Sequence, residues 1–163
     1  MRKYELTEET KTLADGTVLH RIRALMDISR YGVKTGDLGG WIEKYDNLSQ
    51  DGDAFVYGNA EVYGNAWVYG DALVYGDAEV YGNAKVCDNA DYITFKNSWS
   101  SGRWFTYTRS NRMWKVGCFH GTGEELVKKA YADSELSGKC YEAIVRAVET
   151  IESAKAEAKG EHK

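Results

Sequence analysis

Residues 52–87 read Gly52-Asp53-Ala54-Phe55-Val56-Tyr57, Gly-Asn-Ala-Glu-Val-Tyr, Gly-Asn-Ala-Trp-Val-Tyr, Gly-Asp-Ala-Leu-Val-Tyr, Gly-Asp-Ala-Glu-Val-Tyr and Gly-Asn-Ala-Lys-Val-Cys87. In five of the six copies the Val-Tyr pair is followed by Gly-Asn or Gly-Asp, which are typical turn residues. Each copy therefore predicts one short strand and one turn. A six-residue period that persists over consecutive copies indicates stacked repeats, because hairpins have no reason to recur with one fixed side-chain order.

The Val-x-x-x-Ala-x spacing resembles the hexapeptide repeat of left-handed parallel β-helices, in which three hexads form one triangular coil. Weaker copies in residues 40–48 and 88–93 extend the repeat to nine hexads, or about three coils. This resemblance implies a mainly β fold with a short left-handed parallel β-helix over residues 40–93.

The flanking segments complete the expected organisation. Residues 1–39 predict an N-terminal hairpin that caps the β-helix, with a turn at Asp15-Gly16 between two alternating runs. Residues 94–163 predict a C-terminal α+β domain that consists of a β-hairpin and two helices.

Within this last segment, the hairpin turns around Ser110-Asn111, and its register places Tyr107 opposite Trp114. Thr122 and Glu125 form a capping box that opens the first helix. The second helix is expected to begin near Gly138.

A coil of eighteen residues would place Phe55 under Leu73 and Tyr57 under Tyr75 on one outer face. Together the four side chains form a contiguous apolar strip that a monomer rarely leaves exposed to water. We expect further copies of the chain to cover this oligomer interface, with a homotrimer as the favoured assembly. The alternative is that the outward Tyr ladder only stabilises the sheet.

Cysteine content and hydropathy bear on whether the chain is a disulfide-rich, zinc-binding or membrane protein. The three cysteines Cys87, Cys118 and Cys140 are odd in number and lack a C-x-x-C spacing, which favours neither a disulfide framework nor a zinc site. No apolar run approaches the roughly 18 residues of a membrane span. We therefore expect a cytoplasmic protein with no metal, no cofactor and no membrane partner.

Charge is strongly segregated along the chain. Residues 40–91 carry ten acids against two lysines, whereas residues 92–123 carry no acid and interleave basic with aromatic side chains. Arg and Lys neutralise phosphates, and Trp or Tyr rings stack on bases, so this block suits a nucleotide-like ligand. The expected ligand-binding residues are Lys96, Trp99, Arg103, Arg109, Arg112, Lys115 and His120. An alternative is that the aromatics form a core while the arginines pair with the acidic repeats.

Several motifs resemble a group of phage and prophage hexapeptide-repeat proteins with Tyr-Gly-Asn-Ala repeats and a small C-terminal domain, whose members are often labelled transferases. The motifs are Tyr4-Glu5-Leu6, Arg21-Ile22-Arg23-Ala24-Leu25, Gly39-Gly40-Trp41-Ile42, Asp46-Asn47-Leu48-Ser49 and Gly117-Cys118-Phe119-His120-Gly121-Thr122. The resemblance covers most of the chain and implies a phage origin and a bacterial host. The resemblance assigns no catalytic residues to this chain.

The transferase label has little chemical support. Acyltransferases built on this helix use a His as general base, and His20, His120 and His162 are the three histidines of the chain. His120 is the best candidate, but residues 92–123 contain no carboxylate to orient it. We therefore expect no catalytic residues.

Three functions remain open. The first is a non-catalytic phage protein that binds a small anion or a host protein, with inhibition of host defence as one role. The second is a structural or protein-interaction module, and the third is an acyltransferase with His120 as base. An extended nucleic acid is disfavoured, because the acidic repeats would repel a long phosphate backbone.

Overall fold

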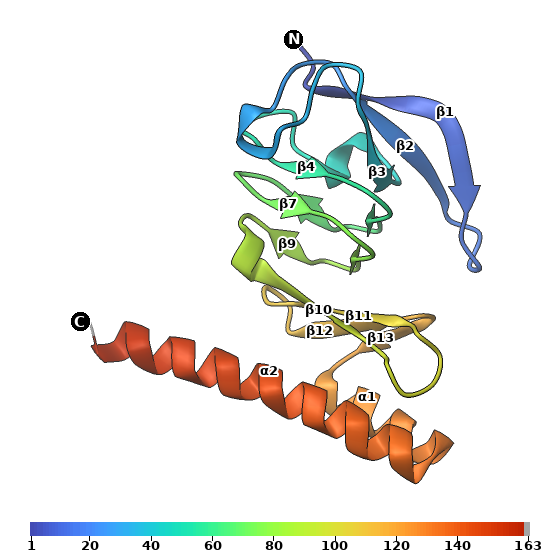
Figure 1. Ribbon diagram of the computed structural model, residues 1–163, viewed down its shortest axis with the longest axis vertical. Helices are drawn as coiled ribbons and strands as arrows, with labels where there is room; N and C mark the ends of the chain where they lie inside the picture. Colours follow the sequence, from blue (N-terminus) through green and yellow to red (C-terminus); the bar gives the residue numbers. More distant parts are fainter. Residues whose placement is uncertain (162–163) are drawn as a thin grey trace. The chain divides into compact units, whose positions relative to one another are not determined.

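A computed structural model describes residues 1–161, which divide into two compact units (Figure 1). The first unit is Met1–His120 and contains the hexapeptide repeats. The second begins at Gly121 and contains the two α-helices found within residues 1–161. His162 lies outside the described residues.

The strands of residues 1–161 form four small sheets. Their bounds are β1 Tyr4–Thr12, β2 Val18–Ala24, β3 Leu38–Ile42, β4 Phe55–Val56, β5 Glu61–Val62, β6 Trp67–Val68, β7 Leu73–Val74, β8 Glu79–Val80, β9 Lys85–Val86, β10 Tyr92–Lys96, β11 Trp104–Thr108, β12 Met113–Val116 and β13 Phe119–Gly121. One sheet has the order β1-β2-β3-β5-β8 and another β10-β11-β12-β13, while β4-β7 and β6-β9 are two-stranded.

The hexads of residues 52–87 pair in parallel at an offset of eighteen residues. Phe55 lies beside Leu73, Glu61 beside Glu79, and Trp67 beside Lys85. These three pairings are confirmed as the sequence predicts them.

The predicted fold class is nevertheless wrong. The sequence predicts a mainly β chain built on a left-handed parallel β-helix, whereas the described residues form a mixed α and β structure with four separate sheets. Within residues 1–161, no sheet is closed or continues as a solenoid. A physical reason is that the hexad strands are only two residues long. Such short strands do not form a sheet of their own along the whole repeat, and β5 and β8 instead extend the larger sheet that begins with the antiparallel strands β1–β3.

The core of the first unit consists of small and β-branched side chains from the hexads. The Val and Ala residues at the repeated positions are fully or almost fully buried, and they are Ala54, Val56, Ala60, Val62, Ala66, Val68, Ala72, Val74, Ala78, Val80, Ala84 and Val86. Alanine lets neighbouring turns approach closely, and valine fills the space beside it on a pleated strand.

Phe55 is also part of this core, with 0% of its side chain exposed. The expected apolar strip placed it on the outer surface, and this placement is wrong. Gly39 explains the burial, because a Cβ at that position would come within 2.9 Å of the Phe55 ring and 2.5 Å of the Val56 carbonyl oxygen. The missing side chain of Gly39 lets β3 pass directly over Phe55.

The sheet β10-β11-β12-β13 follows the hexads. Tyr107 pairs with Trp114 and Phe105 with Val116, which confirms the predicted hairpin register. The sequence did not predict β10, which pairs antiparallel with β11 so that Lys96 lies beside Trp104.

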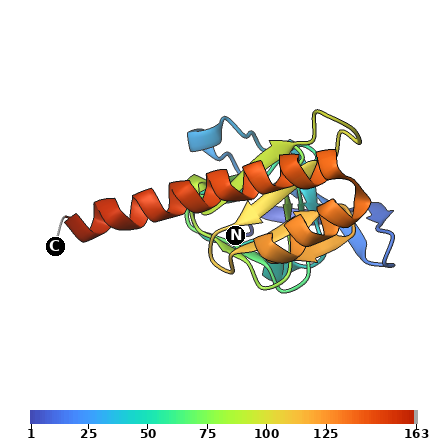
Figure 2. The same ribbon diagram turned by 90° about the horizontal axis from the view of Figure 1, so that it is seen from below.

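The second unit contains helix α1, Gly123–Asp133, and helix α2, Glu135–Glu161. Figure 2 shows the longer α2 extending well beyond α1. The predicted capping box is confirmed, since the Glu125 amide donates to Thr122 Oγ1 at 3.2 Å and Glu125 Oε2 accepts from the Thr122 amide at 3.2 Å. α2 begins three residues before the expected Gly138.

A buried lysine lies beside the first hexad. Lys3 has 2% of its surface exposed, and its ammonium group donates to the carbonyl oxygens of Ala54 at 2.5 Å, Gly52 at 3.3 Å and Asp51 at 3.4 Å. Burial lowers the pKa of Lys3 from 10.5 to about 8, against the opposing effect of Asp53 and Asp51. Three carbonyl groups at the start of the hexads thus receive donors from one side chain.

This pKa predicts how stability depends on pH. Because the pKa of Lys3 is lower in the folded chain, the unfolded chain binds more protons between pH 8 and 10.5, so the free energy of unfolding rises with pH in that window. Lys3→Met should remove this contribution. Urea unfolding at about pH 8 and about pH 10 should show wild type gaining stability relative to Lys3→Met.

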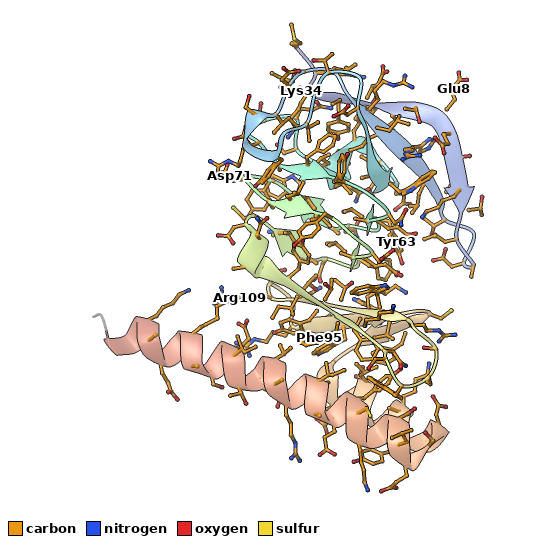
Figure 3. The ribbon with its side chains drawn as sticks, in the orientation of Figure 1. Glu8, Lys34, Tyr63, Asp71, Phe95 and Arg109 are labelled. Atoms are coloured by element: carbon orange, nitrogen blue, oxygen red, sulfur yellow. The ribbon has the colours of Figure 1, made fainter. Side chains whose placement is uncertain are left out.

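The matched control is Lys34→Met, since Lys34 is exposed (Figure 3). It should leave the difference between the two pH values unchanged. Parallel pH profiles for wild type and Lys3→Met would contradict the assignment.

Candidate binding site

One face of β11 packs against the last hexads. Thr106 Oγ1 accepts a hydrogen bond from the Glu79 amide at 2.9 Å, and Ser110 Oγ accepts from the Lys85 amide at 2.7 Å. Asn111 Nδ2 donates to Asn83 Oδ1 at 3.1 Å. These bonds fix the sheet on the repeats, and the alternation of β11 places Trp104 on the same face as Thr106.

Trp104 stands between two hollows of this unit. The first, of about 300 Å³, has walls from Tyr75, Tyr92, Ile93 and Trp104. The second, of about 340 Å³, is lined mainly by charged residues. Both share Asp77 and Trp104, and we refer to the two together as the Trp104 groove.

The aromatic walls of the first hollow are accessible. Tyr75 is 57% exposed and Trp104 is 36% exposed. Tyr92 is buried and donates from its hydroxyl to the Leu73 carbonyl at 2.8 Å, while burial raises its pKa to about 12. The hollow therefore offers two accessible aromatic rings beside a buried, neutral phenol that is anchored to the Leu73 carbonyl.

Carboxylates outnumber bases in the second hollow. Glu61 forms an ion pair with Lys11 at 2.5 Å, and Glu79 pairs with Lys115 at 3.9 Å. Burial and the neighbouring Glu61 raise the pKa of Glu79, against the effect of the two lysines. Asp77 accepts only a long hydrogen bond from Asn59 at 3.4 Å, and no ion pair to it is found within residues 1–161.

The structure does not bring the seven predicted ligand-binding residues into one site. Lys96 and Arg103 lie at one end of the sheet, where Lys96 pairs with Trp104. Arg109 and Arg112 follow the opposite end of β11, and Figure 3 shows Arg109 at that end. Six residues of extended chain, about 20 Å, separate Arg103 from Arg109.

Two further predicted ligand residues are engaged within the protein. Lys115 is 9% exposed, donates to the Gly117 carbonyl and lies 5.6 Å from the centre of the Tyr81 ring. Trp99 packs edge-on against Phe105, with ring centroids 6.1 Å apart. Of the seven, Arg103 alone lines the Trp104 groove.

His120 ends an aromatic column and does not line the Trp104 groove. Tyr63, labelled in Figure 3, lies 4.6 Å from Tyr81 between ring centroids, and Tyr81 lies 4.8 Å from the imidazole. A Cβ on Gly82, whose φ is +72°, would come within 2.8 Å of that ring. Burial lowers the pKa of His120, and nearby Lys115 lowers it further.

The predicted oligomer interface changes with the burial of Phe55. Tyr57 and Tyr75 are exposed and Leu73 is half-buried, so the exposed part of the strip consists mainly of two tyrosines. Tyr75 belongs to the Trp104 groove instead. The homotrimer stays a prediction.

The sequence interpretation did not assign Asp77, Tyr92 or Trp104 to a site. The eighteen-residue register places Asp77 in the column of Asn59, and β11 places Trp104 on the face that meets the hexads. The two registers together predict the groove, but only when the pairing of β10 with β11 is also known.

Comparison with known proteins gives no assignment. No protein-family model matches the chain, and no curated protein is significantly similar to it. Within residues 1–161, no three His, Cys, Asp or Glu side chains are grouped to hold a metal ion, and the three cysteines are free. None of the described helices has both the length and the apolar character needed to cross a bilayer.

The His120 environment leads to a prediction. NMR titration of the imidazole should give a pKa below the ordinary 6.5, and Lys115→Met should raise it by removing a nearby positive charge. Arg112→Met, at the exposed turn, is the control and should leave the titration unchanged. A His120 pKa insensitive to Lys115→Met, in a variant with an unchanged circular dichroism spectrum, would contradict the assignment.

Proposed function

We propose that the chain is a non-catalytic binding protein of phage origin that recognises a host protein through the Trp104 groove. Its place of action would be the cytoplasm of an infected or lysogenic bacterium, where such a protein could block a component of host defence. The resemblance of its motifs to phage hexapeptide-repeat proteins supports this origin.

The observation that carries the proposal is the exposed Trp104 ring between two adjoining hollows. Trp and Tyr are enriched where few residues supply most of the binding energy, because their large rings bury much apolar area. Tyr75 adds a second exposed ring to the same surface. Hydrogen bonds from the hexads to Thr106 and Ser110 hold β11 in place, so the groove is preformed.

A small anion fits this surface less well than a protein does. The basic residues expected to bind a small anion lie at two ends of the sheet. Lys115 already forms an ion pair with Glu79 and donates a hydrogen bond to the Gly117 carbonyl. In the second hollow, three carboxylates face Arg103 and Lys11. A phosphate group would meet net negative charge there.

The acyltransferase alternative has less support than a binding role. His120 lines neither hollow of the Trp104 groove. Its imidazole packs against Tyr81 and Gly82, and the charged side chain that acts on it is the cation of Lys115. A general base needs an accessible position beside the substrate proton, which this arrangement does not favour.

The test uses Trp104→Ala with Trp67→Ala as the matched control, since Trp67, on a hexad strand, is 40% exposed and Trp104 is 36% exposed. A host protein retained by the tagged chain would be identified, purified and its affinity measured by calorimetry. Trp104→Ala should weaken that affinity at least about tenfold, or 1.4 kcal/mol, whereas Trp67→Ala should not.

Equal losses in both variants would contradict a role for the groove. Native mass spectrometry of the purified chain gives a second outcome that would overturn the proposal. A bound species of nucleotide mass, lost with Arg103→Glu or Arg109→Glu, would assign the anionic ligand expected from the sequence.

A further inference from the structure

The first hollow of the Trp104 groove combines ring faces with a single charged side chain. Its volume of about 300 Å³ lies at the lower limit of small-ligand sites, which suits one side chain of a partner. Tyr75 and Trp104 supply exposed rings, and Asp77 supplies the carboxylate. No Lys or Arg lines this hollow.

We propose that this hollow binds the guanidinium group of an arginine side chain presented by a partner protein, with Asp77 as its counter-ion and Tyr75 and Trp104 as stacking faces. This inference rests on the proposed function, because it names the chemistry that the same groove recognises.

The charge of Asp77 favours a cation. Asp77 is exposed, and within residues 1–161 no basic side chain forms an ion pair with it. The other two carboxylates of the groove, Glu61 and Glu79, already have lysine partners. Asp77 is thus the carboxylate of the groove that remains available to an incoming positive charge.

The same chain already binds a guanidinium at the equivalent position of other hexads. Arg30 lies between Asp53, at 3.1 Å from its Nε, and Asp71, at 3.4 Å from its Nη2. Asp53, Asp71 and Asp77 each directly follow the first glycine of a hexad. Carboxylates at this turn position therefore project where an arginine can reach them.

A guanidinium suits the hollow better than an ammonium. It is planar, stacks on aromatic faces and can donate two parallel hydrogen bonds to one carboxylate. Cations over Trp and Tyr rings are attracted by the ring quadrupole, and the attraction increases when water is excluded. The hollow presents both a carboxylate and aromatic rings within one small volume.

The experiment follows the indole N–H resonance of Trp104 by NMR, assigned with Trp104→Phe. The probe is acetyl-Gly-Arg-Gly-amide, and the matched controls replace its arginine by citrulline, which is neutral and nearly isosteric, or by lysine. We expect the arginine peptide to shift Trp104 saturably, with a dissociation constant on the order of millimolar. The lysine peptide should bind several-fold more weakly, and the citrulline peptide should give no saturable shift.

Two variants locate the interaction. Asp77→Asn keeps the shape of the side chain but removes its charge, and it should weaken binding of the arginine peptide at least fivefold, on the order expected for a charge-assisted pair. Glu8→Gln also removes one negative charge, at an exposed position of strand β1, and should leave binding unchanged (Figure 3). An unaltered amide spectrum confirms that each variant is folded.

Several results would overturn the inference. They are equal binding of the citrulline peptide, unchanged affinity in Asp77→Asn, no saturable shift below about 20 mM arginine peptide, and tighter binding of AMP than of the arginine peptide at Trp104. If the partner affinity still depends on Trp104 while the arginine peptide fails, the proposed function stands and only its arginine chemistry is lost. If the arginine peptide binds but no partner affinity depends on Trp104, the arginine site stands and the proposed function is lost.

Discussion

Backbone hydrogen bonds between hexads eighteen residues apart are the interaction on which the first unit depends. The Phe55 amide donates to Ala72, and the Tyr57 amide donates to Val74, at 3.0 and 2.8 Å. Each such strand is only two residues long, so buried Val and Ala side chains must supply the remaining stability. The last hexads then offer amides to Thr106 and Ser110, which fix the sheet of β10–β13. The position of Trp104 beside Asp77 follows from this register.

The acidic character of the hexads has a more local meaning than their total charge suggests. Four of the five carboxylates of residues 52–87 have basic partners within the first unit, namely Glu61 with Lys11, Glu79 with Lys115, and Asp53 and Asp71 with Arg30. Asp77 differs because it lies beside exposed aromatic rings and has no such partner within residues 1–161. Net charge alone favours no ligand, whereas the placement of one unpaired carboxylate favours a cation.

The sequence predicts features that depend on local spacing. The register of Tyr107 with Trp114 and the capping box of Thr122 follow from neighbouring residues, and the offset of eighteen residues follows from the resemblance of the hexads to a coil of three repeats. It does not predict how short strands combine into sheets, because that depends on contacts between distant segments such as Gly39 over Phe55. For the same reason the basic residues, close in sequence, lie at opposite ends of β11. To predict the Trp104 groove, one needs both the hexad register and strand β10. The sequence does not reveal β10, because its first residues resemble the end of the repeat.

Recognition of a protein partner through the Trp104 groove can be tested by hydrogen–deuterium exchange of the chain, alone and with that partner. Recognition through the Trp104 groove predicts slower exchange of backbone amides in residues 75–77 and 93–104 when the partner is bound, because binding there excludes water and suppresses local opening. Residues 109–112, at the other end of the sheet, should be unchanged. Protection confined to residues 109–112, with unaltered exchange in 75–77 and 93–104, would show that the partner does not bind at the Trp104 groove.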